Sequence, residues 1–258
     1  MELSHREASE LRALATRGGR KRLDLCRCEG VRAVREVLNR APAALRFIAL
    51  TPRGEAAFGP GVPPSLMRRC TEAEFASLAA TVNTQGVLAL AAVPPEPEGA
   101  VEGEFILALD RLSDPGNCGA IARTCFAAGG REIWRTAGTV DPWCDKALRA
   151  GLSAQFALGW RTFGSLAELK TAAAEKGFGN FFIADPHEGE NCFTTPDLYD
   201  DSVIVIGNEA NGVTEIPSGS RRVRIPMPGD FESLNAAQAA TVLLVEFVRR
   251  QCAVGKAS

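Results

Sequence analysis

Apolar segments alternate with helical segments through the C-terminal part of this chain. Nearly continuous apolar runs predict strands at 105–109, 132–136, 160–162, 181–185, 202–207 and 222–225. Helical patterns are expected between and after them, at 120–128, 146–150, 166–175 and 233–249. Strands that are apolar on both faces and alternate with helices are typical of a parallel sheet covered on both sides. The sequence therefore predicts an α/β domain at 101–258.

A smaller α/β module is expected at 1–93. Its helical patterns and apolar strand runs alternate along the chain, with helices at 6–15, 31–38 and 71–78 and strands at 45–50 and 86–93. The last of these helices opens with Thr71 and Glu74, at the spacing of a capping box. Three closely spaced prolines follow the module, and prolines this dense continue neither helix nor strand. We therefore interpret 94–100 as a linker.

Three polar, glycine-containing segments lie at the ends of predicted strands of the larger domain, at 114–123, at 206–212, and at 225–229 running on into 233–235. Open α/β sheets bind their ligands at the carboxyl ends of the strands, so these segments are candidates for a ligand site. No G-x-G-x-x-G fingerprint follows the first strand, which disfavours a dinucleotide-dependent oxidoreductase. Three such segments in this order indicate a ligand site more specifically than any one of them does alone.

Each polar residue in these segments also has a purely structural explanation. Asn117 could cap the following helix, and Ser233 is a natural cap for the last one. Arg123 lies in an apolar helical stretch, where a cation reaches water, pairs with a carboxylate or points at an anionic ligand. Glu209 lies in a Gly-Asn-Glu turn of a kind that is common on surfaces. Nearby, the exposed apolar end of the strand at 225–227 would suit the flat face of an adenine.

Charge is distributed unevenly along the chain. Residues 1–93 contain 14 Lys and Arg against 9 Asp and Glu, whereas residues 94–258 contain 15 against 22, so a net −2 divides into +5 and −7. The densest basic cluster is Arg17-Gly-Gly-Arg20-Lys21-Arg22. This cluster is either a solvated face or a phosphate-binding surface for a polyanion such as RNA.

Cysteine usage and the termini indicate a reducing compartment. The eight cysteines include no C-x-x-C pair and the chain has two histidines, so neither a metal site nor a disulfide framework is expected. The N-terminus lacks the apolar core of a secretory signal, and the longest apolar run is too short to span a membrane. We therefore expect a cytoplasmic protein with no membrane partner.

Together, the three segments resemble the signature motifs of the SpoU/TrmH family of RNA ribose 2′-O-methyltransferases, a branch of the SPOUT class. The first motif keeps an Asn and an Arg six residues later, here Asn117 and Arg123. The second is a Gly-x-Glu turn followed by Gly, and the third runs Ile-Pro-Met and then Ser-Leu-Asn. One departure is visible at 151–154, where Gly-Leu-Ser-Ala replaces the frequent Ser-x-Gly-Ala.

The resemblance implies a sheet with a deep trefoil knot that binds S-adenosylmethionine (AdoMet), and a homodimer. It places the catalytic centre at Asn117, Arg123, Glu209, Ser233 and Asn235, and the cofactor contacts at Gly207, Ile225, Met227 and Leu234. An arginine stays protonated in proteins, so we expect Arg123 to clamp a phosphate and stabilise the developing alkoxide, while Ser233 and Asn235 orient the nucleophile. The helix after the third motif is apolar nearly all round, which also favours a partner subunit.

More loosely, residues 1–93 resemble the L30e-like substrate-binding module frequent in the family, through Arg22, Cys28-Glu29-Gly30 and Gln85-Gly86-Val87. The candidate RNA contacts in this module are Arg20, Lys21 and Arg22. Ribosomal RNA is the expected substrate because of this separate module. Two alternatives stay open: a tRNA ribose 2′-O-methyltransferase, and a catalytically silent RNA-binding member of the family.

Overall fold

The computed structural model describes residues 1–229 and 233–255 of the chain. This part divides into two compact units: Met1–Pro95 with Asp141–Ala157, and Glu96–Val140 with the described residues from Leu158 onward. The first stretch thus ends at Pro95, inside the segment interpreted as a linker. Asp141–Ala157 groups with the N-terminal module although it lies far along the sequence, which the sequence did not suggest.

The first unit is built on a four-stranded sheet of order β1-β4-β2-β3. Strand β4 is antiparallel to both of its neighbours, and β3 is parallel to β2. Its elements are α1 (His5–Ala13), α2 (Arg17–Leu23), β1 (Leu25–Glu29), α3 (Val31–Arg40), η1 (Pro42–Ala44), β2 (Leu45–Leu50), α4 (Pro52–Phe58), β3 (Met67–Arg69), α5 (Glu72–Ala76), β4 (Val87–Ala92), α7 (Asp145–Gly151) and η2 (Ala154–Ala157). The predicted capping box at Thr71 is present at the start of α5.

Two ion pairs, each between a buried arginine and a partly buried aspartate, attach α7 and the residues before it to the rest of the first unit. Arg27 donates from Nε and Nη2 to the two oxygens of Asp145, at 2.9 and 2.6 Å. Arg20 donates from Nε to Asp141 at 2.7 Å and is only 7% exposed. An arginine buried in this way is not available to RNA, so the predicted basic surface narrows to the exposed Lys21 and Arg22.

The second unit contains a seven-stranded sheet of order β7-β6-β5-β10-β8-β11-β9, and every strand pair in it is parallel. This confirms the predicted parallel sheet. Its elements are β5 (Phe105–Leu109), α6 (Pro115–Ala127), β6 (Glu132–Thr136), β7 (Gly159–Phe163), α8 (Leu166–Glu175), β8 (Asn180–Ala184), β9 (Glu190–Asn191), β10 (Ser202–Ile206), β11 (Arg221–Arg224) and α9 (Ala236–Ala253).

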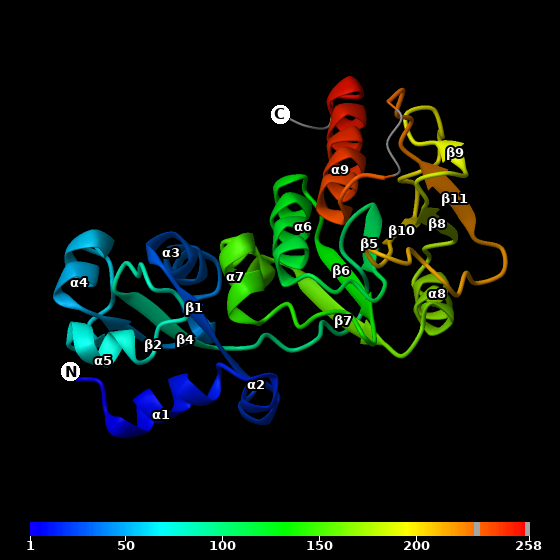
Figure 1. Ribbon diagram of the computed structural model, residues 1–258. Helices are drawn as coiled ribbons and strands as arrows, with labels where there is room; N and C mark the ends of the chain where they lie inside the picture. Colours follow the sequence, from blue (N-terminus) through cyan, green and yellow to red (C-terminus); the bar gives the residue numbers. More distant parts are fainter. Residues whose placement is uncertain (230–232, 256–258) are drawn as a thin grey trace. The chain divides into compact units, whose positions relative to one another are not determined.

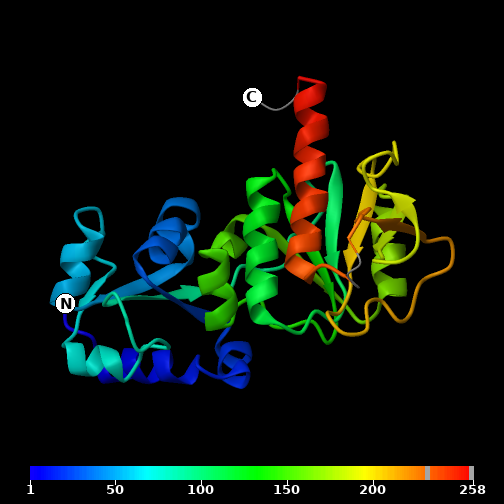
Figure 2. The ribbon, with the colours of Figure 1, turned by 45° about the horizontal axis from the view of Figure 1, so that its top comes forward.

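Helices cover both faces of this sheet. On one face, Leu166 and Leu169 of α8 join a buried cluster with Trp134 and with alternate residues of β5, β8 and β10. On the other, α6 and α9 pack side by side (Figures 1 and 2). The ring of Phe247 on α9 lies 4.8 Å from that of Phe105 on β5, at a steep angle. Because α6 follows β5 and α9 follows β11, both helices begin at the carboxyl edge of the sheet.

Within the described ranges, no helix combines the length and the apolar character needed to cross a membrane.

Candidate functional site

The first motif forms the start of α6, which begins earlier than predicted. Asp114 is the N-cap, and its side chain accepts a hydrogen bond from the Asn117 amide at 2.9 Å. Pro115 occupies the first helical position, where its missing N–H costs nothing. Asn117 is therefore the third residue of the helix, so the interpretation of Asn117 as the cap is wrong, and its side chain is free to face the second motif.

The second motif is a tight turn after β10. The amide of Asn208 donates to the carbonyl of Gly212 at 3.1 Å, and the reverse bond measures 2.9 Å. A Cβ at Gly207 would lie 2.6 Å from the carbonyl carbon of Gly212, so a side chain cannot fit there. The side chain of Asn208 donates to the carbonyl of Arg111 at 2.8 Å, which attaches the turn to the end of β5.

Glu209 leaves this turn and receives four hydrogen bonds from residues 113–117, at the start of the first motif and directly before it. The amide and hydroxyl of Ser113 donate to Oε2 at 3.0 and 2.7 Å. The amide of Asp114 and Nδ2 of Asn117 donate to Oε1 at 3.0 and 2.9 Å. Each carboxylate oxygen therefore has two donors.

Asn235 connects the third motif to the same group. Its Oδ1 accepts from the amides of Ala237 and Gln238, at 2.9 and 3.4 Å, so Asn235 is the N-cap of α9. Its Nδ2 donates to Oδ1 of Asn117 at 3.1 Å. The cap predicted at Ser233 is wrong: α9 begins at Ala236, later than expected. The three motifs thus meet in one hydrogen-bonded cluster of Glu209, Asn117 and Asn235.

The hydrogen bonds keep the Glu209 carboxylate ionised. Its partial burial raises the pKa, but the bonds from the Ser113 hydroxyl and amide, Asn117 and the Asp114 amide outweigh this and lower the pKa to about 2. Donors to the charged form favour it in this way. At neutral pH, Glu209 is a fixed negative charge at the carboxyl edge of the sheet.

Other predicted site residues lie outside the cluster. Arg123 is exposed on α6, and Ser233 is exposed before α9. Among the residues that the structure describes, no hydrogen bond joins either of them to Asn117, Glu209 or Asn235. Three apolar side chains with predicted cofactor roles are half-buried in the segment after β11 and just before α9: Ile225, Met227 and Leu234.

Sequence reasoning missed Ser113, which supplies two of the four donors to Glu209. The missed signal was the Asp-Pro pair at 114 and 115, because an N-cap aspartate followed by proline marks a helix start. A helix beginning at Pro115 would have placed residues 113 and 114 directly beside the second motif.

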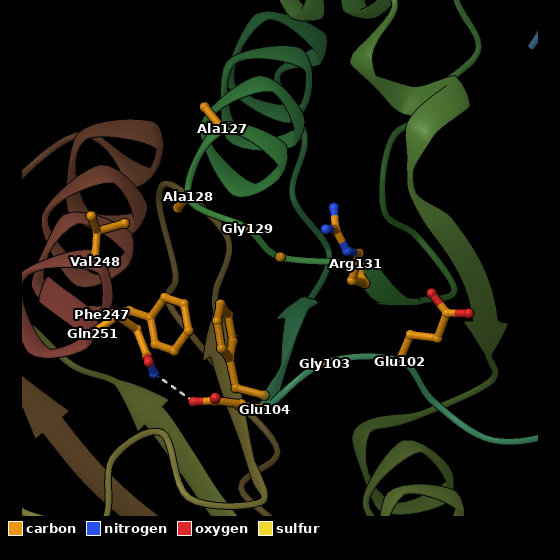
Figure 3. Close-up of a pocket in the computed structure, with 12 residues that line it drawn as sticks. Glu102, Gly103, Glu104, Ala127, Ala128, Gly129, Arg131, Phe247, Val248 and Gln251 are labelled. Carbon is orange, nitrogen blue, oxygen red and sulfur yellow. Dashed lines mark hydrogen bonds between the residues drawn. The ribbon is translucent and has the colours of Figure 1, made fainter. Parts of the chain in front are cut away.

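A separate pocket lies at the opposite edge of the sheet (Figure 3). It has a volume of about 660 Å³ and lies between the start of β5 and the ends of α6 and α9. Its apolar wall includes Phe105, Phe247 and Val248, and Gln251 donates to Glu104 across one side at 2.5 Å. None of the residues predicted for the site lines this pocket.

The architecture is that of an α/β protein with a polar, hydrogen-bonded cluster at the carboxyl edge of a parallel sheet. A family model described as the SpoU rRNA methylase family matches residues 104–245. The chain belongs to this family, which confirms the resemblance of its three motifs. The matched region runs continuously through Asp141–Ala157, the segment that packs within the first unit.

Individual relatives agree with this assignment. A tRNA/rRNA methyltransferase of Synechocystis sp. is 32% identical over 186 residues, which cover 69% of this chain and 66% of the relative. The aligned region is therefore a little less than two thirds of that relative's length.

Solved structures share the fold over almost the whole chain. One is described as an RNA methyltransferase of the TrmH family from Porphyromonas gingivalis, with a TM-score of 0.82, 26% identity, and coverage of 97% of this chain and 100% of that one. The SpoU methyltransferase AviRb from Streptomyces viridochromogenes, in complex with AdoMet, has a TM-score of 0.78 at 22% identity, with coverage of 97% and 100%. At this level of identity, the second comparison shows that the two proteins share a fold.

Proposed function

We propose that the protein is an AdoMet-dependent RNA ribose 2′-O-methyltransferase that acts on ribosomal RNA. The observation that carries this proposal is the hydrogen-bonded cluster of Asn117, Glu209 and Asn235. It brings together one polar residue from each of the three motifs that define the family resemblance. Membership of a family of RNA methylases supports the reaction class.

The residues at the carboxyl edge of the sheet fit the proposed cofactor. Half-buried Ile225, Met227 and Leu234 offer apolar surface for an adenine, and Gly207 keeps the adjoining turn free of a side chain. The ionised Glu209 carboxylate favours a cationic ligand at this edge. When bound, AdoMet supplies a methyl group activated by its sulfonium charge.

The side chains of the cluster and its neighbours suit a reaction in which negative charge grows on a ribose oxygen. Asn117 and Asn235 each keep one amide N–H that is not used within the cluster, and such preorganised donors stabilise developing negative charge. In our proposal, Arg123 extends from the exposed side of α6 to clamp the neighbouring phosphate, and Ser233 and Asn235 orient the hydroxyl. A guanidinium is suited to this because its planar fork binds phosphate with two bonds.

The remaining features belong to the same proposal. The N-terminal unit serves as an L30e-like module that contacts RNA through Lys21 and Arg22, and its separate character favours ribosomal RNA over tRNA. The second unit carries the deep trefoil knot of its class, the protein is a homodimer, and it works in the cytoplasm.

Calorimetry with AdoMet and with NAD⁺ tests the cofactor assignment. We expect saturable binding of AdoMet and none of the dinucleotide. Leu234→Asp should abolish the heat of AdoMet binding, because it places a charge against the adenine surface. Arg131→Lys, at the opposite edge of the sheet, should leave it unchanged. Binding of NAD⁺ in preference to AdoMet would contradict the proposal.

A further inference from the structure

We propose that Ser113 is a positioning residue for methyl transfer, acting through Glu209 and Asn117 on Asn235. The inference rests on the proposed function and deepens it. It assigns a role to a residue outside the three family motifs, and it assigns Glu209 the role of an orienting acceptor and not of the base that takes the ribose proton.

The bonding pattern around Glu209 supports this assignment. A carboxylate offers about four lone-pair sites, and four donors occupy them: the Ser113 amide and hydroxyl, the Asp114 amide, and Nδ2 of Asn117. No lone pair is left for a substrate hydroxyl. Glu209 therefore cannot accept the proton of the ribose 2′-OH unless one of these bonds breaks.

The same pattern fixes the direction of the amides that follow. Because Nδ2 of Asn117 faces Glu209, its Oδ1 faces Asn235 and accepts from Nδ2 there at 3.1 Å. Oδ1 of Asn235 is used in turn by the backbone at the start of α9. Within the relay of Glu209, Asn117 and Asn235, Oδ1 of Asn235 accepts two bonds and Oδ1 of Asn117 accepts one. Each of the two amides keeps one N–H that is not used within the relay, so both can donate to a substrate.

The direction of these hydrogen bonds determines the role of the cluster in the reaction. In the transfer, the 2′-oxygen forms a bond to the methyl carbon, and the methyl–sulfur bond breaks with its electron pair staying on sulfur. The hydroxyl proton leaves to a water molecule. The amides of Asn117 and Asn235 stabilise the charge that grows on the 2′-oxygen but do not remove its proton.

Ser113 sets the orientation of the Glu209 carboxylate, the first group in this relay. Its hydroxyl makes the shortest of the four bonds to Glu209, at 2.7 Å. Without it, Oε2 keeps one protein donor and gains water, and the carboxylate can rotate away from Asn117. Misorientation of a group that contacts the transition state lowers turnover more than substrate binding.

Steady-state kinetics of methyl transfer to RNA test the proposal with Ser113→Ala, Ser113→Thr and Ser113→Cys. We expect Ser113→Ala to lower kcat about tenfold while the KM for AdoMet changes less than about twofold, as for an interaction made in the transition state. Ser113→Thr keeps the hydroxyl and should recover kcat to within about twofold. Ser113→Cys, a weak donor of similar shape, should fall between them. Ser218→Ala, an exposed serine elsewhere in the unit, is the matched control and should behave as wild type.

The outcomes separate this proposal from the proposed function. An active wild type with an equally active Ser113→Ala variant overturns the role of Ser113 alone, as does a threonine variant that recovers nothing. A fall in AdoMet affinity that matches the fall in kcat also overturns it, because it indicates a structural role. A wild-type protein that binds AdoMet but transfers no methyl group to any RNA overturns both proposals.

Discussion

At Glu209, four donors converge on one carboxylate, and all of them come from residues 113–117. Their net effect is a pKa of about 2 against an ordinary value of 4.5. A carboxyl whose pKa is lowered on folding stabilises the folded state above its unfolded pKa. This contribution is therefore present above about pH 4.5 and is lost as the pH falls towards 2. Throughout the neutral range the cluster keeps one protonation state.

Arg123 provides the residue-scale prediction. Arg123→Lys keeps the positive charge but loses the planar fork that binds phosphate with two bonds. We expect turnover to fall by about one order of magnitude or more, equivalent to roughly 1.4 kcal/mol per tenfold, with AdoMet affinity nearly unchanged. The measurement is single-turnover methyl transfer together with calorimetry. Arg131→Lys is the control, and near-normal turnover in Arg123→Lys would count against the assigned role.

Among the elements, the connection from α7 to η2 explains the departure from the family pattern at 151–154. Gly151 ends α7, and a Cβ there would lie 2.5 Å from the side-chain oxygen of Gln155. Ser153 has φ +60°, the left-handed conformation that glycine adopts without strain. Its hydroxyl is buried and has no hydrogen-bond partner. The serine therefore stands where the frequent pattern has its glycine.

Ser153→Gly should stabilise the protein. The change removes left-handed strain and a buried hydroxyl without a partner, and the greater freedom of glycine in the unfolded chain offsets part of this gain. We expect a net gain of about 1 kcal/mol and a rise in unfolding temperature of about 2–4 °C. Differential scanning calorimetry measures it. Ser153→Ala removes the hydroxyl but keeps the strain and should gain less; an unfolding temperature lowered by Ser153→Gly would refute this explanation.

Most elements of the second unit could be predicted because their apolar patterns are long and uninterrupted. The runs at 105–109, 132–136 and 166–175 match β5, β6 and α8 residue for residue. Strand β1 was missed because it contains Arg27 and Glu29, which read as exposed but are buried, Arg27 through its pair with Asp145. That pairing joins residues more than one hundred positions apart, and no local pattern indicates it.

The candidate site, like the fold, could be predicted in part. Its motif residues were found through their order and spacing, and the structure joins Asn117, Glu209 and Asn235. The contribution of Ser113 could not be found in this way, because it depends on where α6 begins and on two loops meeting in space. Arg20 was predicted to contact RNA, but it is buried and pairs with Asp141. The sequence could not show this, because the two residues are far apart along the chain.

At the scale of the whole molecule, the surface of helix α9 is relevant to the proposed homodimer. The helix packs on α6 and on Phe105 along one side, whereas Val245 on the other side is 56% exposed. A single exposed apolar residue is ordinary on a protein surface, so the proposed homodimer rests on the family resemblance, and Val245 is the position at which it can be tested. The net positive charge of residues 1–93, against the net negative charge of residues 94–258, supports our proposal that the N-terminal unit contacts RNA.

Light scattering at micromolar concentration tests the assembly. We expect a mass about twice that of one chain. Val245→Glu should shift the mass towards that of a single chain, because it buries a charge in the proposed interface, whereas Arg12→Glu on α1 of the other unit should not. A single-chain mass for the wild type would contradict the homodimer.

The most direct test of ribose methylation is to map 2′-O-methyl groups in total RNA from cells with and without this gene. We predict that one ribose methyl group is lost from ribosomal RNA when the gene is absent. The wild-type gene should restore it, and a gene carrying Asn235→Ala should not. Identical ribose methylation in both cell lines, or a difference confined to methylated bases, would contradict the account.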